Sequence, residues 1–227
     1  MRRKLTAIFL AIALGALGAL GALTLSGCAE PTGQGRGVYL LMDTSGTYTK
    51  ELKKAEQIIT AILAQLEPGD SFAVARIDTG SFSERDIVAK MTFDDRPSKA
   101  NQQKRQFREE IAKFVRTVKP ASYTDITGGV LQATEYLNEK NPGIKTVLIF
   151  SDLKEDLKKG YVRDIPLELR GFEVVALNVT KLLSDNIDPR EYMTRLEDWQ
   201  RRVEDGGGAW RVVNDFDRLE RILVAAR

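Results

Sequence analysis

The chain contains no histidine and only one cysteine among its 227 residues. Ser-His-Asp triads, histidine-ligated zinc sites and Cys-His nucleophile pairs all require an imidazole, so the sequence excludes these three kinds of site. Much of known enzyme chemistry is therefore ruled out before any motif is considered.

The chain also lacks a surplus of basic residues. The first 27 residues carry three basic and no acidic side chains, and without them 31 Lys and Arg face 32 Asp and Glu, a formal charge of −1. Domains that bind nucleic acid usually carry a clear basic surplus, so nucleic acid is not an expected partner. With 43% hydrophobic and 29% charged residues, the composition fits one sizeable domain plus a short appendage.

The appendage is N-terminal and has the features of a targeting segment. Arg2, Arg3 and Lys4 form a basic start, residues 5–25 are apolar, and the tetrapeptide Leu25-Ser26-Gly27-Cys28 follows. This tetrapeptide resembles a bacterial lipobox.

That resemblance implies that residues 1–27 are a signal peptide and that Cys28 becomes the lipidated first residue of the mature protein. Residues 28–36 would then tether a domain to a membrane of the bacterial envelope, facing the periplasm or the exterior. An uncleaved signal anchor is the alternative, because about 20 apolar residues can span a bilayer. Small residues and a cysteine directly after the apolar run favour processing, since an anchor does not need them.

From residue 38 onward, strand-like and helix-like patterns alternate. Short apolar runs indicate strands, whereas apolar residues that recur every three or four positions indicate helices. The expected strands are 38–42, 71–77, 86–93 (as an edge strand), 145–150, 172–179 and 210–213, and the expected helices are 50–66, 99–118, 128–139, 190–204 and 215–225. This alternation predicts a three-layer α/β fold, with a mostly parallel central sheet and helices on both faces.

Oxygen-bearing side chains gather next to these predicted elements. Asp43, Ser45 and Thr47 lie in the turn after the first strand, Thr124 lies in the loop before the third helix, and Asp152 follows the fourth strand. Ligands of such sheets bind beyond the carboxyl ends of the strands, where these segments fall. Carboxylate and hydroxyl oxygens suit a hard cation such as Mg²⁺.

Together the three segments resemble a von Willebrand factor type A (VWA) domain covering residues 37–227. The family's metal-ion-dependent adhesion site (MIDAS) reads DxSxS, then a lone Thr, then an Asp after a central strand. The resemblance implies that Mg²⁺ or Mn²⁺ is held by Asp43, Ser45, Thr47, Thr124 and Asp152. Thr47 departs from the motif, since it keeps the hydroxyl and adds a methyl group. Neutral hydroxyl ligands leave a cation much of its charge, and in this family an Asp or Glu of a partner protein fills the open position.

Each segment also has a local explanation. Ser45 and Thr47 could be ordinary turn residues, because hydroxyls bond nearby backbone groups. Thr124, or the better-placed Thr127, could cap the following helix, and Asp152 begins a capping-box spacing. The joint placement of three separate segments favours one shared metal site over these local roles.

Two further functions fit parts of the pattern. The turn Asp43-Thr44-Ser45-Gly46-Thr47 also resembles the first motif of haloacid-dehalogenase-type phosphotransferases, which use an aspartate nucleophile beside Mg²⁺, with Ser151 as a second motif. Ser45 stands where that family has its acid-base Asp, and a helix is expected near Lys50 where that family inserts a flap, so we expect no enzyme. The other alternative is a VWA-like scaffold that binds without metal. In the metal-site interpretation, Asp125 and Ser151 lie at the edge of the site.

Overall fold

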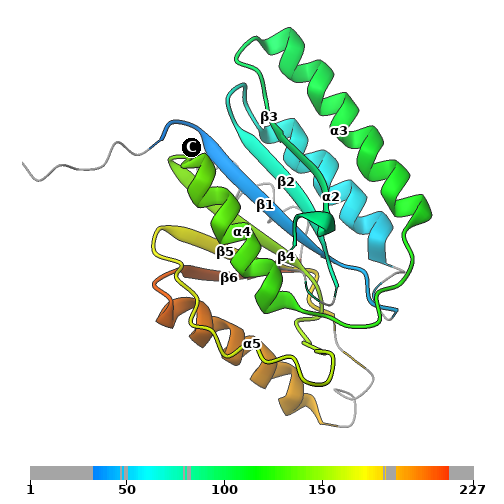
Figure 1. Ribbon diagram of the computed structural model, residues 1–227, viewed down its shortest axis with the longest axis vertical. Helices are drawn as coiled ribbons and strands as arrows, with labels where there is room; N and C mark the ends of the chain where they lie inside the picture. Colours follow the sequence, from blue (N-terminus) through cyan, green and yellow to red (C-terminus); the bar gives the residue numbers. More distant parts are fainter. Residues whose placement is uncertain are drawn as a thin grey trace, which may run out of the picture. The chain divides into compact units, whose positions relative to one another are not determined.

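The computed structural model describes residues 33–46, 48, 51–78, 80, 83–180, 182 and 188–214. They form a six-stranded sheet flanked by helices (Figure 1). The strands are β1 (Arg36–Asp43), β2 (Ser71–Ile77), β3 (Ile87–Thr92), β4 (Ile144–Phe150), β5 (Phe172–Leu177) and β6 (Ala209–Val213). The helices are α2 (Leu52–Gln65), α3 (Pro97–Thr117), α4 (Ile126–Lys140) and α5 (Pro189–Asp205), with a 3₁₀ turn η2 (Glu84–Asp86). No helix in this part of the chain is long and apolar enough to cross a membrane.

The sheet confirms the predicted fold class. Its strand order is β3-β2-β1-β4-β5-β6, and every neighbouring pair is parallel except β2 with the edge strand β3. The predicted elements agree with the observed ones to within a few residues, apart from the closing helix at 215–225, which lies outside the described residues. Strand β5 ends at Leu177, two residues before its predicted end, because Asn178 turns into the left-handed region with φ 52°.

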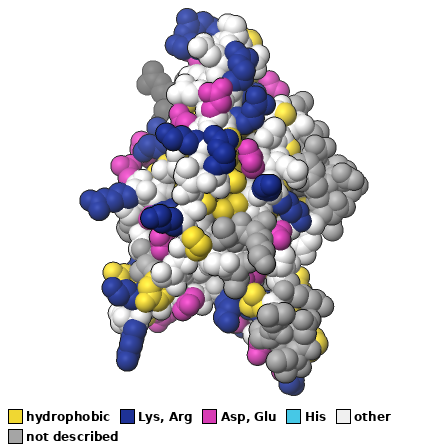
Figure 2. Space-filling model, turned by 90° about the vertical axis from the view of Figure 1, so that its right-hand side faces the viewer, with side chains coloured by type: hydrophobic (Ala, Val, Ile, Leu, Met, Phe, Trp, Pro, Cys, Tyr) yellow, Lys and Arg dark blue, Asp and Glu magenta, His cyan; other side chains and the backbone are white. Residues whose placement is uncertain are grey.

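Helices cover both faces of the sheet, because successive strand residues point to opposite sides. In β1, Leu40 and Met42 pack in one core with α2 and α3, whereas Tyr39 and Leu41 pack in the other with α4 and α5. The central strands are buried on both sides, which explains their continuous apolar sequences. On the face shown in Figure 2, basic and acidic side chains are interspersed, in keeping with the balanced composition.

The connection from β4 to β5, residues 151–171, is unusual. Parallel strands are normally joined through a crossover helix, but this crossover loop contains no helix although the structure describes all of it. Leu167 and Leu169 are buried, while Tyr161, Val162 and Ile165 are exposed. The loop starts at the carboxyl edge of the sheet, where the predicted site lies.

Candidate metal site

Two carboxylates from the prediction lie at the carboxyl ends of neighbouring strands. Asp43 is the last residue of β1, and Asp152 follows β4 by two residues. The register pairs Met42 with Phe150, so both chains leave the sheet at the same edge. Asp43 is 1% exposed and Asp152 is 4% exposed. The fold therefore brings together two segments more than 100 residues apart and buries an acidic side chain from each.

Asp43 is held by hydrogen bonds on both of its carboxylate oxygens. The Ser45 amide donates to Oδ1 (2.8 Å), and the fully buried Ser151 hydroxyl donates to Oδ2 (2.7 Å). Charge-assisted bonds of this kind are stronger than neutral ones and fix the direction of the carboxylate. Ser151, which the sequence placed at the edge of the site, is thus in direct contact with Asp43.

Asp152 is an electrostatically costly group. Burial raises its pKa, the Lys154 amide that donates to its Oδ1 (2.9 Å) lowers the pKa, and the charge of Asp43 raises it again. Lys154 and Arg195 also lower this pKa by their charge. Among the described residues, however, no Lys or Arg side chain forms an ion pair with either Asp43 or Asp152.

The capping-box interpretation of Asp152 is wrong. Residues 152–155 are irregular and no helix follows, because the crossover loop continues to β5 without one. The carboxylate instead accepts a hydrogen bond from the amide two residues on, which forms an Asx turn.

Ser45 follows Asp43 by two residues, and Thr124 lies in the loop before α4. Ser45 forms an isolated bridge with Ala121, whose amide donates to the Thr44 carbonyl (2.8 Å). Thr124 is buried and forms an antiparallel bridge with Asp156, with N–H to O distances between the two residues of 2.7 and 3.0 Å. The loop before α4 is thereby tied to the turn after β1 on one side and to the crossover loop on the other. Thr47 lies outside the described residues.

The capping interpretations of Thr124 and Thr127 are also wrong. Asp125 is the N-cap of α4 and accepts from the Gly128 amide (2.8 Å), while Thr127 already lies in the first helical turn. The Thr127 hydroxyl donates to Glu155 Oε1 (2.7 Å). Asp125 also forms an ion pair with Arg163 of the crossover loop, whose Nε (2.9 Å) and Nη2 (2.8 Å) both donate to Asp125 Oδ2. Asp125 therefore supports the loop around Thr124.

The donor set fits a hard cation. Its candidate ligand atoms are oxygens only, the type that such a cation takes. The two carboxylates are not part of a larger cluster, because the described residues contain no group of three or more His, Cys, Asp or Glu placed to bind a metal. Two carboxylates with neighbouring hydroxyls suit Mg²⁺, which keeps several waters and needs few protein ligands. Hydrogen bonds to the carboxylates supply the outer support that such ligands commonly have.

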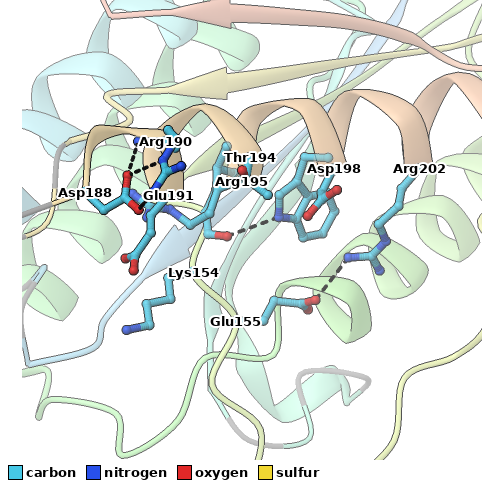
Figure 3. A pocket seen from close by; sticks show the side chains of 11 residues that line it. Lys154, Glu155, Asp188, Arg190, Glu191, Thr194, Arg195, Asp198 and Arg202 are labelled. Atoms are coloured by element: carbon cyan, nitrogen blue, oxygen red, sulfur yellow. Dashed lines mark hydrogen bonds and ion pairs between the residues drawn. The ribbon is translucent and has the colours of Figure 1, made fainter. Parts of the chain in front are cut away.

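A separate cavity of about 520 Å³ lies beside this site, between α5 and residues 153–155 (Figure 3). Charged side chains line it, and several pair with each other: Arg190 with Asp188, and Arg202 with Glu155. Sequence analysis did not find this surface, because its residues come from two segments about 40 positions apart that carry no motif.

Comparison with known proteins supports the fold assignment. No family model and no curated protein matches the sequence. Among solved structures, a von Willebrand factor type A protein from Catenulispora acidiphila aligns with TM-score 0.55 at 14% identity, over 86% of this chain and 42% of that one. The pilus adhesin SpaC from Lactobacillus rhamnosus GG, in its open conformation, aligns with TM-score 0.55 at 13% identity, over 85% of this chain and 29% of that one.

The fold is therefore that of a VWA domain, as the sequence motifs predicted. This chain spans less than half the length of either of these two structures. At such low identity the likeness establishes the fold alone.

Proposed function

We propose that this protein is a membrane-anchored, non-enzymatic binding module that captures an acidic residue of a partner protein through Mg²⁺ or Mn²⁺. The cation would be held at a MIDAS-type site by Asp43, Ser45, Thr47, Thr124 and Asp152. The proposal rests on the carboxylate pair, because Asp43 and Asp152 are buried at adjacent strand ends and, among the described residues, neither forms an ion pair with a Lys or Arg side chain. Buried charges are costly unless they are paired or bind a metal.

Hydrogen bonds orient both carboxylates of the proposed site. The amide of Ser45 and the hydroxyl of Ser151 orient Asp43, and the amide of Lys154 orients Asp152. When bound, the cation supplies an electrophilic position for a partner carboxylate. Preorganised ligands lower the cost of ordering side chains on binding.

The charges around Asp152 favour an acidic partner. Lys154 and Arg195 lie close enough to lower the pKa of Asp152, and the Arg195 Nε donates to its backbone carbonyl (3.3 Å). A divalent cation would balance the two carboxylates, and the exposed Lys154 side chain beside them would add a positive charge. Such complementarity speeds encounter with an acidic partner and disfavours a basic one. SpaC, which shares the fold, is described as a pilus adhesin, and an interaction role for this chain is in keeping with it.

The phosphotransferase alternative finds little support in the geometry. Helix α2 begins at Leu52, which leaves only eight residues between it and β1 for a flap.

Anchoring is a separate part of the proposal. It rests on the lipobox resemblance of residues 25–28, with Cys28 as the acylated residue, and these residues lie outside the described part of the chain. The location proposed on this basis is the bacterial envelope, on its periplasmic or exterior side.

Thermal unfolding of the full chain in detergent tests the metal site. Mg²⁺ or Mn²⁺ at 100 times its dissociation constant should stabilise the fold by about 2.7 kcal/mol relative to EDTA. Asp152→Asn should abolish this difference, whereas Asp156→Asn should keep it, because Asp156 lies in the same loop with an exposed side chain. In EDTA, Asp152→Asn should unfold at the same or a higher temperature than the wild type, since burial disfavours the lost charge.

Equal stability of the wild type in metal and in EDTA would contradict the metal site and favour the metal-independent scaffold. The partner is tested by capture from envelope extract. Binding should require metal and Asp152, and capture that persists in EDTA would contradict a metal-bridged contact.

A further inference from the structure

Leu153, directly after Asp152, has an unusual backbone conformation. Its φ is 66°, in the left-handed region, and its side chain is 1% exposed. For a bulky residue this conformation is rare and unfavourable, because the side chain approaches the following carbonyl. Such strain persists only where the surroundings hold it in place, and it concentrates at functional sites.

Hydrogen bonds hold the backbone on both sides of Leu153. Its amide donates to Ser151 Oγ (3.1 Å), the same hydroxyl that donates to Asp43. Its carbonyl accepts from the indole Nε1 of Trp199 on α5 (3.2 Å). Trp199 is 3% exposed, so this bond is shielded from competing water.

The peptide unit between Leu153 and Lys154 links Trp199 to Asp152. Its C=O accepts from Trp199, and its N–H donates to Asp152 Oδ1. A peptide unit is planar and trans, so its carbonyl and amide point in opposite, fixed directions. A donor that fixes the carbonyl therefore also fixes the direction of the bond that orients the carboxylate.

The indole ring is itself held in position. The Arg202 guanidinium lies 4.3 Å from the Trp199 ring centroid and pairs with Glu155 Oε2 (3.0 Å). The other oxygen of Glu155 accepts from the amide and hydroxyl of Thr127 at the start of α4 (2.7 Å each). Figure 3 shows the Arg202 and Glu155 side chains meeting across the cavity. Trp199 is thus linked to the crossover loop by its indole N–H and, through Arg202 and Glu155, to the start of α4.

We propose that Trp199 is a positioning residue for the metal site, acting on Asp152 through the Leu153–Lys154 peptide unit. The inference rests on the proposed function. Trp199 does not touch the carboxylate, and its indole N–H instead selects the strained backbone in which Asp152 points toward the site.

The test removes the indole N–H and keeps a smaller aromatic ring. Trp199→Phe is compared with Trp210→Phe, the same change at the other tryptophan of the chain, which packs against the same core from β6. Two measurements are made on the full chain in detergent. The first is hydrogen exchange of the Lys154 amide without metal, and the second is Mn²⁺ affinity from the electron paramagnetic resonance signal of free Mn²⁺.

Trp199→Phe should speed exchange of the Lys154 amide about fivefold, as loss of a supporting hydrogen bond predicts, and should weaken Mn²⁺ binding about tenfold, as expected for support outside the ligands. Trp210→Phe should change neither. If Trp199→Phe does not fold, benzothienylalanine at position 199 replaces the N–H by sulfur at nearly constant ring size.

The outcomes separate the two hypotheses. Unchanged Lys154 exchange in the Trp199 variant overturns the positioning role, whether or not the wild type binds Mn²⁺. Faster exchange with unchanged Mn²⁺ affinity overturns it as well, because the bond then does not serve the site. Wild-type protein that binds no Mn²⁺ refutes the proposed function, and the positioning role toward metal falls with it.

Discussion

The ion pair between Arg163 and Asp125 makes a sharp prediction about stability. Arg163→Met keeps an apolar side chain but removes both hydrogen bonds to Asp125 Oδ2, and leaves a carboxylate that is 1% exposed with the Gly128 amide as its partner. Removing one member of a buried ion pair costs about 3–5 kcal/mol. We therefore expect a loss of about 3–4 kcal/mol at pH 7.

The opposite change should cost less. Asp125→Asn keeps an oxygen for the Gly128 amide, and the Arg163 side chain, 19% exposed, can turn toward water. We expect a loss of about 1–2 kcal/mol. The double variant should then be less destabilised than the two single losses combined, by about 2 kcal/mol or more, because the residues are in direct contact.

Urea denaturation of the full chain in detergent, followed by circular dichroism, measures these losses. The reasoning is refuted if Arg163→Met costs less than about 1 kcal/mol at pH 7. Additive single changes would also refute it.

Two further predictions follow from residues outside the site. Burial raises the pKa of Tyr39, of Tyr48 and of Tyr136, the last to about 12, so the folded state keeps these phenols protonated where the unfolded chain releases its protons near pH 10. Their contribution to stability is therefore fully present below about pH 10 and is lost as the pH rises further. In an alkaline titration, tyrosinate absorbance from these three residues should appear only together with loss of ellipticity. Ionisation of these phenols before the protein unfolds would contradict their burial. Cys28→Ser should leave an unacylated precursor of higher mass than the processed wild type, whereas an intact, unacylated N-terminus in wild-type protein from bacterial membranes would contradict lipidation.

The fold was predictable because its elements carry their own signals. Apolar runs such as β4 and the amphipathic pattern of α2 are local, and their alternation implies a parallel sheet. The same logic placed Asp43 and Asp152 at one edge, since parallel strands end together. The strand order that makes β1 and β4 neighbours has no local signal, and only the structure shows it.

Ser151 and Asp125 were placed at the edge of the candidate site by the sequence, but Trp199 and Arg163 could not be predicted from it. Trp199 lies 46 positions from Leu153, and Arg163 lies 38 positions from Asp125. These contacts depend on the path of a crossover without a helix, which departs from the usual connection of parallel strands. The same departure explains why a capping-box pattern at Asp152 was misleading, since local spacing does not reveal whether a helix follows.

The direction of β1 has a consequence for how the protein could reach a partner. The strand enters the sheet at Arg36 and ends at Asp43 at the far edge, seven residues on, a distance of about 23 Å for an extended strand (Figure 1). The chain that precedes the sheet therefore joins it at the amino edge, whereas Asp43 and Asp152 lie at the carboxyl edge. If the chain is anchored through Cys28 as proposed, the tether and the candidate metal site would meet the sheet at opposite edges.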